Sequence, residues 1–227
     1  MPERSVDMVE VNRRAFLATA ATAAAAALAD DEKLTDGGYA EVSPPGAPSR
    51  KTPLVPPGAE GLAGFARRCV GCQLCVAQCP SRVLRPLEKR HPGAPLAILQ
   101  PVMGFEHGYC RPECTACGDV CPAGAIRRLS PRQKKAVRIG HAVWNKDLCL
   151  AAAEGVTCHA CERHCLGNAI TLVPADPKDK SSPKVPKVDE SKCIGCGACE
   201  HLCPARPMPA MTVEGYPAHA AGRDSVV

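Results

Sequence analysis

Apolar residues occur along this chain in short stretches separated by polar and Pro-rich segments. Four of the stretches follow a group of cysteines, at residues 83–84, 125–129, 169–173 and 211–213. Two others, at 142–147 and 187–190, come before a group. Runs of this length bounded by turn residues predict short β-strands. The units around the third and fourth cysteine groups are therefore expected to consist of a strand, a cysteine loop, a short helix and a second strand.

The supply of apolar side chains limits the hydrophobic core. Val, Leu, Ile and Phe make up 43 of the 227 residues, or about 19%, and the chain has one Trp and 23 prolines. This is near the level at which chains fail to fold alone. We therefore exclude a large aliphatic core: either the chain is largely disordered or something other than side chains fills its centre, and the sixteen cysteines favour the second alternative.

Sixteen cysteines occur in four groups with a common spacing, called motifs one to four here. Motifs one and four follow C-x2-C-x2-C-x3-C and run into a proline, whereas motif two opens with three intervening residues and motif three with eight. First cysteines lie 41, 39 and 44 residues apart, which indicates an internal repeat. In chain order the groups are Cys69, Cys72, Cys75 and Cys79; Cys110, Cys114, Cys117 and Cys121; Cys149, Cys158, Cys161 and Cys165; and Cys193, Cys196, Cys199 and Cys203.

This spacing is typical of 4Fe-4S ligation. Three closely spaced cysteines wrap a tight loop around a cubane, and the fourth, sent onward by the proline, ligates the cluster of a partner motif. Structural zinc would leave the third cysteine unexplained. Disulfides are disfavoured because cysteines three apart within a motif are poor partners for one another.

Residues 68–80, RCVGCQLCVAQCP, and the three related runs resemble the motifs of bacterial polyferredoxins. Four motifs behind a twin-arginine leader resemble the ferredoxin-type proteins of periplasmic nitrate reductase and methylamine utilisation systems. The resemblance covers roughly residues 65–214. It implies an α+β fold in which two ferredoxin-like dicluster modules, with short strands, short helices and little aliphatic core, surround four 4Fe-4S clusters. All sixteen cysteines are then iron ligands.

Two pairings of the motifs are open. By the ferredoxin pattern, neighbouring motifs exchange their fourth cysteines, while the rival pairing joins motif one to four and two to three. The neighbour pairing gives four ligand sets: Cys69, Cys72, Cys75 and Cys121; Cys110, Cys114, Cys117 and Cys79; Cys149, Cys158, Cys161 and Cys203; and Cys193, Cys196, Cys199 and Cys165.

The N-terminus predicts export. Residues 12–17, NRRAFL, match the twin-arginine pattern, a fifteen-residue apolar run covers 15–29, and residues 27–29 form an A-x-A cleavage site. We expect this domain order: a twin-arginine signal peptide at 1–29, a Pro-rich linker at 30–64, dicluster modules at 65–135 and 136–216, and a mobile tail at 217–227. The Pro-rich segment 174–186 is expected to be a surface loop.

Charge gives no reason to expect a nucleic-acid partner. The polypeptide carries a formal net charge of +5, and each oxidised cluster with its four thiolates adds about −2, so the holoprotein is expected near −3. One dense basic stretch lies between motifs two and three, at residues 127–138. Its favoured interpretation is a solvated connector, and its alternative is a docking face for an acidic partner.

No catalytic motif accompanies the cysteines: a dinucleotide loop, a P-loop and a nucleophile elbow are all missing from the sequence. We therefore predict an electron carrier rather than an enzyme. It is expected to be periplasmic, peripheral to the membrane at most, and to relay single electrons between a membrane quinol-oxidising or flavin-bearing partner and a reductase. The alternatives are an iron-sulfur subunit of a larger catalytic oxidoreductase and an accessory factor for maturation of a redox enzyme.

Overall fold

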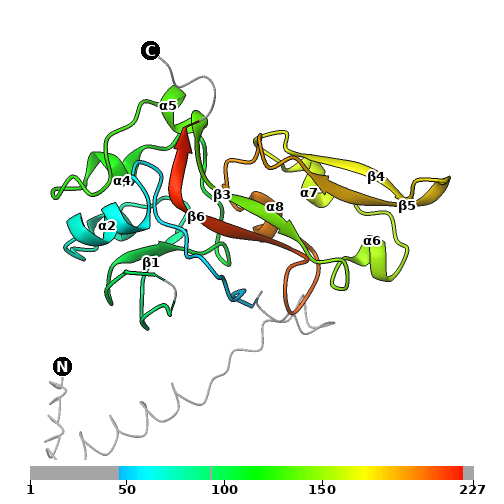
Figure 1. Ribbon diagram of the computed structural model, residues 1–227, viewed down its shortest axis with the longest axis horizontal. Coiled ribbons are helices and arrows are strands. Elements are labelled where there is room, and N and C mark those ends of the chain that lie inside the picture. Colours follow the sequence, from blue (N-terminus) through cyan, green and yellow to red (C-terminus); the bar gives the residue numbers. More distant parts are fainter. Residues whose placement is uncertain (1–45, 93, 222–227) are drawn as a thin grey trace, which may run out of the picture. The chain divides into compact units, whose positions relative to one another are not determined.

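The computed structural model describes residues 46–92 and 94–221 (Figure 1). The predicted signal peptide at 1–29, the first part of the predicted linker and the last six residues of the predicted tail lie outside the described residues. Everything described belongs to one compact unit that begins at Pro44. Within the described residues, no helix is long and apolar enough to cross a membrane.

The described chain consists of short helices and strands, which agrees with the mixed composition expected from the sequence. Most helices have only four residues and sit inside or next to a cysteine motif. In chain order the elements are α2 (Leu62–Arg68), α3 (Leu74–Ala77), β1 (Leu84–Pro86), β2 (Pro101–Met103), α4 (Ala116–Asp119), α5 (Pro131–Ala136), β3 (Val137–Trp144), α6 (Leu150–Ala153), α7 (Ala160–Arg163), β4 (Ile170–Asp176), β5 (Asp179–Val188), α8 (Ala198–His201) and β6 (Met211–Ala221).

The strands pair in three antiparallel two-stranded sheets, β1 with β2, β3 with β6, and β4 with β5. Trp144 lies opposite Met211 in the β3–β6 pair, so the strands entering motif three and leaving motif four lie side by side. The predicted strands near 83–84, 142–147, 169–173 and 211–213 are thus present. The strand predicted at 125–129 is wrong, because its backbone donors bond elsewhere: Ile126 N–H points at Cys121 Sγ and Arg127 N–H donates to Gly58 O.

The Pro-rich segment predicted as a surface loop at 174–186 is instead most of the β4–β5 hairpin. Val173 pairs with Val185 and Leu172 with Pro186. Prolines are tolerated here because each strand of a two-stranded sheet has a free edge, where a missing N–H leaves no ladder partner unpaired.

The described part of the predicted Pro-rich linker, residues 46–64, packs against the core, and the linker prediction is wrong there. Leu54 and Val55 are fully buried. Met103 N–H donates to Leu54 O at 2.9 Å, and Gly215 N–H donates to Thr52 O at 3.0 Å. The prolines prevent a regular helix, but the apolar side chains between them fill the core and their carbonyls accept hydrogen bonds from two different motif pairs.

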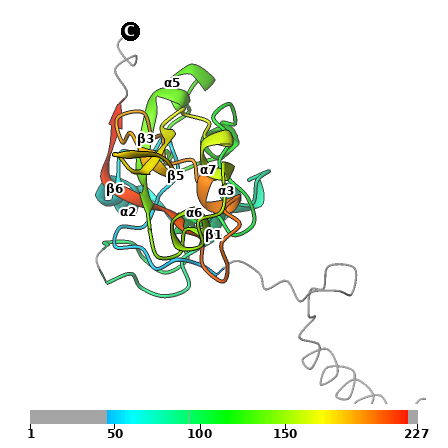
Figure 2. The same ribbon diagram turned by 90° about the vertical axis from the view of Figure 1, so that its right-hand side faces the viewer.

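The predicted mobile tail at 217–227 also begins too early. Strand β6 continues to Ala221, where it pairs with Val137 of β3, and α2 lies beside it (Figure 2). Backbone pairing holds residues 217–221 although they carry no hydrophobic periodicity, which is the signal that the sequence argument relied on.

One hydrophobic core spans both motif pairs. Its fully buried members include Phe65 and Phe105 from the first half of the chain and Met211 and Val213 from the last strand. The predicted boundary between residues 135 and 136 therefore does not divide the core. Several cysteines belong to the same buried cluster, so the core is assembled around the cysteine motifs rather than beside them.

Candidate iron-sulfur sites

The structure gathers all sixteen cysteines into four sets of four, and each set lines its own cavity. Each cavity, its open mouth included, contains about 300–350 Å³ of space not filled by atoms. All sixteen cysteines are free of disulfides. We call the sets site one (Cys69, Cys72, Cys75 and Cys121), site two (Cys110, Cys114, Cys117 and Cys79), site three (Cys149, Cys158, Cys161 and Cys203) and site four (Cys193, Cys196, Cys199 and Cys165).

This grouping coincides with the exchange of fourth cysteines between neighbouring motifs, and not with the rival pairing. The reason is local. Cys75 lies on helix α3 and Cys79 lies just beyond its end, and the two side chains line different cavities. Helix α4 separates Cys117 from Cys121 in the same way. A single turn of helix between the third and fourth cysteines thus sends them to two sites.

Glycines shape the loops that carry the first cysteines of motifs one and four. Gly71 has φ +68° and Gly195 has φ +74°, in the left-handed region that a Cβ disfavours. Burial raises the pKa of the Cys69 and Cys193 thiols, and hydrogen bonds from the backbone of Gly71 and Gly195 oppose that rise. Backbone N–H groups are therefore aimed at sulfur, the arrangement that stabilises cluster thiolates.

Three of the fourth cysteines also accept backbone hydrogen bonds. Ala169 N–H points at Cys165 Sγ at 3.1 Å, Ala210 N–H at Cys203 Sγ at 3.2 Å, and Ile126 N–H at Cys121 Sγ at 3.4 Å. These bonds serve sites four, three and one. The apolar residues that follow motifs two, three and four therefore place a donor on the cysteine that lines the cavity of the neighbouring motif.

Burial disfavours bare thiolates in the cavities. It raises the pKa of Cys75 to about 11 and those of Cys117, Cys161 and Cys196 to about 12. Sulfurs in such surroundings become thiolates only when a cation replaces the proton, so ligand binding here releases protons.

The donor set and the cavities fit a cubane cluster. Each cavity offers four cysteine sulfurs around a volume of a few hundred Å³ and mainly apolar walls. Among the described residues, no three His, Cys, Asp or Glu side chains lie close enough to hold a single metal ion. The four sulfurs of a set therefore surround a space larger than one ion.

The four sites follow one another in the order one, two, four, three. Sites one and two share motifs one and two, and sites four and three share motifs three and four. The two pairs meet where Cys110 N–H donates to Cys196 O at 2.9 Å. A fifth cavity of about 250 Å³ lies at this junction, lined by Cys110, Cys196 and Lys134 among others. Figure 1 shows α4 on one side of the unit and α6 on the other, with α8 between them.

Two charged features near sites two and four, the inner sites of the row, were not predicted from the sequence. The first is Lys134, predicted as part of a solvated connector but only 6% exposed, so that prediction is wrong for this residue. Its Nζ donates to Arg111 O at 2.6 Å and to Cys114 O. A signal was available: Ser130 and Gln133 form a capping box, which predicts the helix α5 that carries Lys134.

The second feature is a buried ion pair between Arg50 and Glu200. The Arg50 Nη2 to Glu200 Oε1 distance is 2.6 Å, and the two side chains are 8% and 3% exposed. Glu200 also accepts from Val213 N–H at 2.7 Å, and burial raises the pKa of this carboxyl even though Arg50 opposes the rise. No local pattern in the sequence links residues 150 positions apart.

Comparisons with known proteins bear on the family. The 4Fe-4S dicluster domain matches residues 68–125 and 156–206. The methylamine utilization ferredoxin-type protein of Methylobacillus flagellatus is 35% identical over 67% of this chain and 64% of its own length, so the chain spans slightly less than two thirds of that relative. The protein of the same name from Methylorubrum extorquens is 35% identical over 66% of this chain and 67% of its own length.

A ferredoxin-type protein of Escherichia coli, NapG, is 33% identical over 66% of this chain and 65% of its own length. Among solved structures, a chain of the formate dehydrogenase, heterodisulfide reductase and formylmethanofuran dehydrogenase complex from Methanospirillum hungatei aligns over 62% of this chain and 46% of its own. The identity is 22% and the TM-score is 0.24, values too low to indicate a shared fold. The dicluster-domain match includes fifteen of the sixteen cysteines, all but Cys149, and the chain belongs to the bacterial ferredoxin-type proteins with 4Fe-4S dicluster domains.

Proposed function

We propose that this protein is a periplasmic electron-transfer polyferredoxin that holds four 4Fe-4S clusters and relays single electrons between redox proteins. The observation that carries the proposal is the arrangement of the four cysteine sets, each around its own cavity, in one continuous row. The clusters would supply one-electron redox chemistry, and neighbouring sites share motifs or touch through backbone.

The chain's own residues hold and shield the sites. Cysteine sulfurs bind, the N–H groups of Ala169 and Ala210 orient and stabilise two of the crossing ligands, and fully buried Phe65 and Val213 line cavities and exclude water. Shielding matters because hydrogen bonds to sulfur and solvent exposure set the reduction potential. No acid or base pair beside a substrate-sized cavity is needed for this role.

The outer end of the row at site one supports exchange of electrons with a partner. Cys72 is exposed, whereas the other cysteines are buried or half-buried. Val70 and Leu74, on either side of it in the chain, are 72% and 49% exposed. A ligand that reaches the surface within an apolar patch shortens the path for an electron into a docked redox protein.

The proposed partners are a membrane quinol-oxidising or flavin-bearing protein and a reductase. Names of the relatives place them among ferredoxin-type proteins, one group of them in methylamine utilization. Deleting the gene should leave a fully matured partner with blocked electron flow. A partner that is present but lacks its own cofactor would point to a maturation role instead, and a stable complex with a catalytic subunit would point to an iron-sulfur subunit.

The proposed location rests on Arg13 and Arg14 of the twin-arginine pattern. Replacing both by Lys should trap the holoprotein in the cytoplasm, as fractionation with immunoblotting would show. Normal export of this variant would refute the proposed route.

Metal analysis tests the core of the proposal. The protein is purified anaerobically without residues 1–29, and iron, acid-labile sulfide and zinc are measured, with EPR before and after dithionite. We expect about sixteen irons and sixteen sulfides and interacting signals from reduced clusters. Four or fewer metal ions, mostly zinc and without sulfide, would replace the electron-transfer proposal by a structural metal protein.

A further inference from the structure

The walls of the four cavities differ in charge. Sites one, three and four are lined by apolar residues, glycine or Gln73 in addition to their cysteines. Site two is lined by Arg111 and Lys134. Arg111 is exposed to solvent, which screens its charge, whereas Lys134 is buried. Among the described residues, Lys134 is therefore the one buried cation in the wall of a cysteine cavity.

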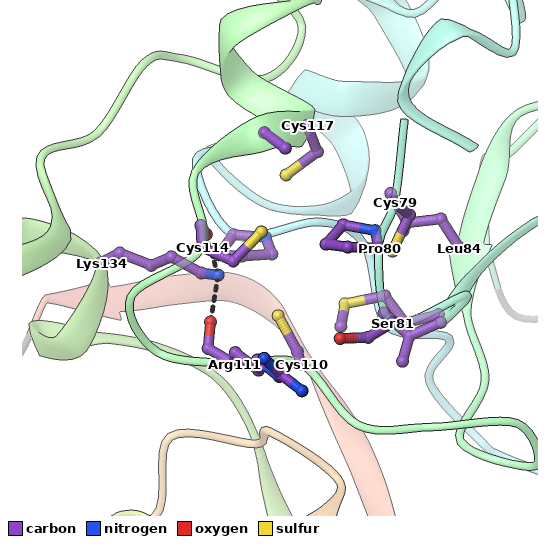
Figure 3. A pocket seen from close by; sticks show the side chains of 13 residues that line it. Cys79, Pro80, Ser81, Leu84, Cys110, Arg111, Cys114, Cys117 and Lys134 are labelled. Atoms are coloured by element: carbon purple, nitrogen blue, oxygen red, sulfur yellow. Dashed lines mark hydrogen bonds between the residues drawn. The ribbon is translucent and has the colours of Figure 1, made fainter. Parts of the chain in front are cut away.

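Lys134 is held in place by the loop that carries the ligands of site two. Its ammonium donates to the carbonyl oxygens of Arg111 and Cys114, between the first and second cysteines of motif two. Figure 3 shows the side chain reaching from α5 to this loop, beside Cys110 and Cys114. The capping box of Ser130 and Gln133 fixes the start of α5, and the ammonium is thus positioned from both ends.

The charge of Lys134 acts on the sulfurs. Its side chain lines the site-two cavity together with Cys110, Cys114 and Cys117, so the buried charge borders the same cavity as three of the four cysteines of that site. The same ammonium lines the fifth cavity, at the junction where Cys110 meets Cys196 of site four. Lys134 therefore lines both the cavity of site two and the cavity at the junction between the two motif pairs.

We propose that the buried positive charge of Lys134 makes site two the most easily reduced of the four sites. An electron then occupies site two before it crosses to site four. The proposal rests on the proposed four-cluster function. One-electron reduction adds one negative charge to a site and forms or breaks no bond. A buried positive charge in the wall lowers the free energy of that added charge, while the apolar walls of the other sites do not.

The test is an EPR-monitored redox titration of the anaerobic holoprotein, with dithionite as the reductant. In Lys134→Gln we expect the highest of the four midpoint potentials to fall and the other three to stay. The equilibrium constant for reducing that site should drop by about tenfold or more, which is about 59 mV or more for one electron. Lys134→Arg keeps the charge and should retain most of the wild-type potential.

Lys135 provides a matched control. It is the next residue of the same helix and also a lysine, but its side chain is 56% exposed and faces Glu113 at 3.4 Å. Lys135→Gln removes the same formal charge and should leave all four potentials nearly unchanged. Equal shifts in the two Gln variants, an unchanged highest potential in Lys134→Gln, or an equal fall in Lys134→Arg would each overturn the proposal.

A second variant keeps the proposal testable even where Lys134→Gln fails to assemble site two. Cys114→Ser changes or removes a ligand of that site, and the EPR signal it alters should be the one reduced at the highest potential in the wild type. If it alters a signal of lower potential, the proposal is wrong. Iron and sulfide counts on the wild type distinguish failure of this inference from failure of the proposed function. Sixteen irons with a site two that is not the most easily reduced site refutes only this inference, whereas a count near four or below refutes the proposed function.

Discussion

Sites two and four form the middle of the row of sites. Both contain four cysteines in the same arrangement, but the charged residues beside them differ. Each takes three cysteines from one motif and a fourth from its neighbour, and the two touch through Cys110 and Cys196. Beside site two lies Lys134, a buried cation that donates to backbone carbonyls and has no ion-pair partner among the described residues. Beside site four lies Glu200, a buried carboxylate that is neutralised by Arg50 from the N-terminal segment.

The difference shows that the cysteine framework and its electrostatic environment come from separate parts of the chain. The framework is contained within the motifs, whereas Lys134 comes from the connector between motifs two and three, and Arg50 comes from a segment ahead of motif one. Equal frameworks can therefore hold clusters of unequal potential.

The crossing ligands should give the largest effect. Cys79→Ser should disturb or remove the cluster of site two, and Cys165→Ser that of site four, because each side chain lines the cavity of the neighbouring motif. Loss of one cluster removes about four of sixteen irons. Iron analysis with EPR of both variants checks this.

Each crossing variant serves as the control for the other, since both remove one fourth cysteine. The two should alter different EPR signals. A loss confined to site three or four in Cys79→Ser would contradict the neighbour pairing and favour the rival exchange between distant motifs.

Arg50→Met should have the next largest effect. It leaves Glu200 buried without its charged partner, and breaking a buried pair on one side costs about 3–5 kcal/mol of the free energy of unfolding. Anaerobic chemical denaturation monitored by circular dichroism measures the loss. The double variant Arg50→Met with Glu200→Gln removes the uncompensated charge and should recover most of it.

Arg68→Met is the matched control for Arg50→Met. Arg68 pairs with Glu60 at 2.7 Å, but these side chains are 43% and 45% exposed. Water screens exposed pairs and they contribute little to stability, so this variant should be nearly as stable as the wild type. Similar losses in both single variants would mean that burial of the Arg50 pair is not what matters.

Gly197→Ala tests a backbone difference between the inner sites. Gly197 lies directly after Cys196 with φ +80°, while Thr115, directly after Cys114, has φ −114°. A Cβ at Gly197 would overlap the ring of Phe105. Left-handed strain and overpacking together should cost about 2–4 kcal/mol of the free energy of unfolding. Chemical denaturation of the holoprotein provides the measurement.

Gly124→Ala separates strain from overlap. Gly124 has φ +62°, but a Cβ there would meet no atom within 4 Å. Only the backbone penalty of about 1–2 kcal/mol should remain. If Gly197→Ala costs no more than Gly124→Ala, Phe105 moves aside freely and the packing under site four is looser than the structure indicates.

The cysteine framework was predictable because iron-sulfur ligation depends on local spacing. One turn of helix between the third and fourth cysteines separates them into two sites, but the partner motif of each fourth cysteine depends on tertiary packing, and the sequence left two pairings open. The role of residues 46–64 was not predictable, since prolines indicate an extended segment but not what it packs against. Strand β6 beyond Pro217 and the Arg50–Glu200 pair depend on contacts across the chain that leave no periodic signal. Lys134 lies between these cases. The capping box predicts the helix that carries it, but no pattern in the sequence predicts that its side chain is buried.

The smallest effect concerns His219, where the end of β6 meets the segment that covers both inner sites. Gly61 bridges to the neighbouring Ala218, and both ring nitrogens of His219 are buried next to the backbone of Ala59. Burial lowers the pKa of this imidazole to about 4, below its usual 6.5, so the folded protein keeps it neutral while the unfolded chain takes up a proton. Stability should therefore be unaffected above about pH 6.5 and fall as the pH drops toward 4. At pH 5 the loss is about 2 kcal/mol.

His219→Phe cannot titrate, so its free energy of unfolding relative to the wild type should improve by this amount between pH 7 and pH 5. A constant difference across this range would mean that folding does not lower the pKa of His219, and that the imidazole takes up a proton as readily in the folded protein as in the unfolded chain.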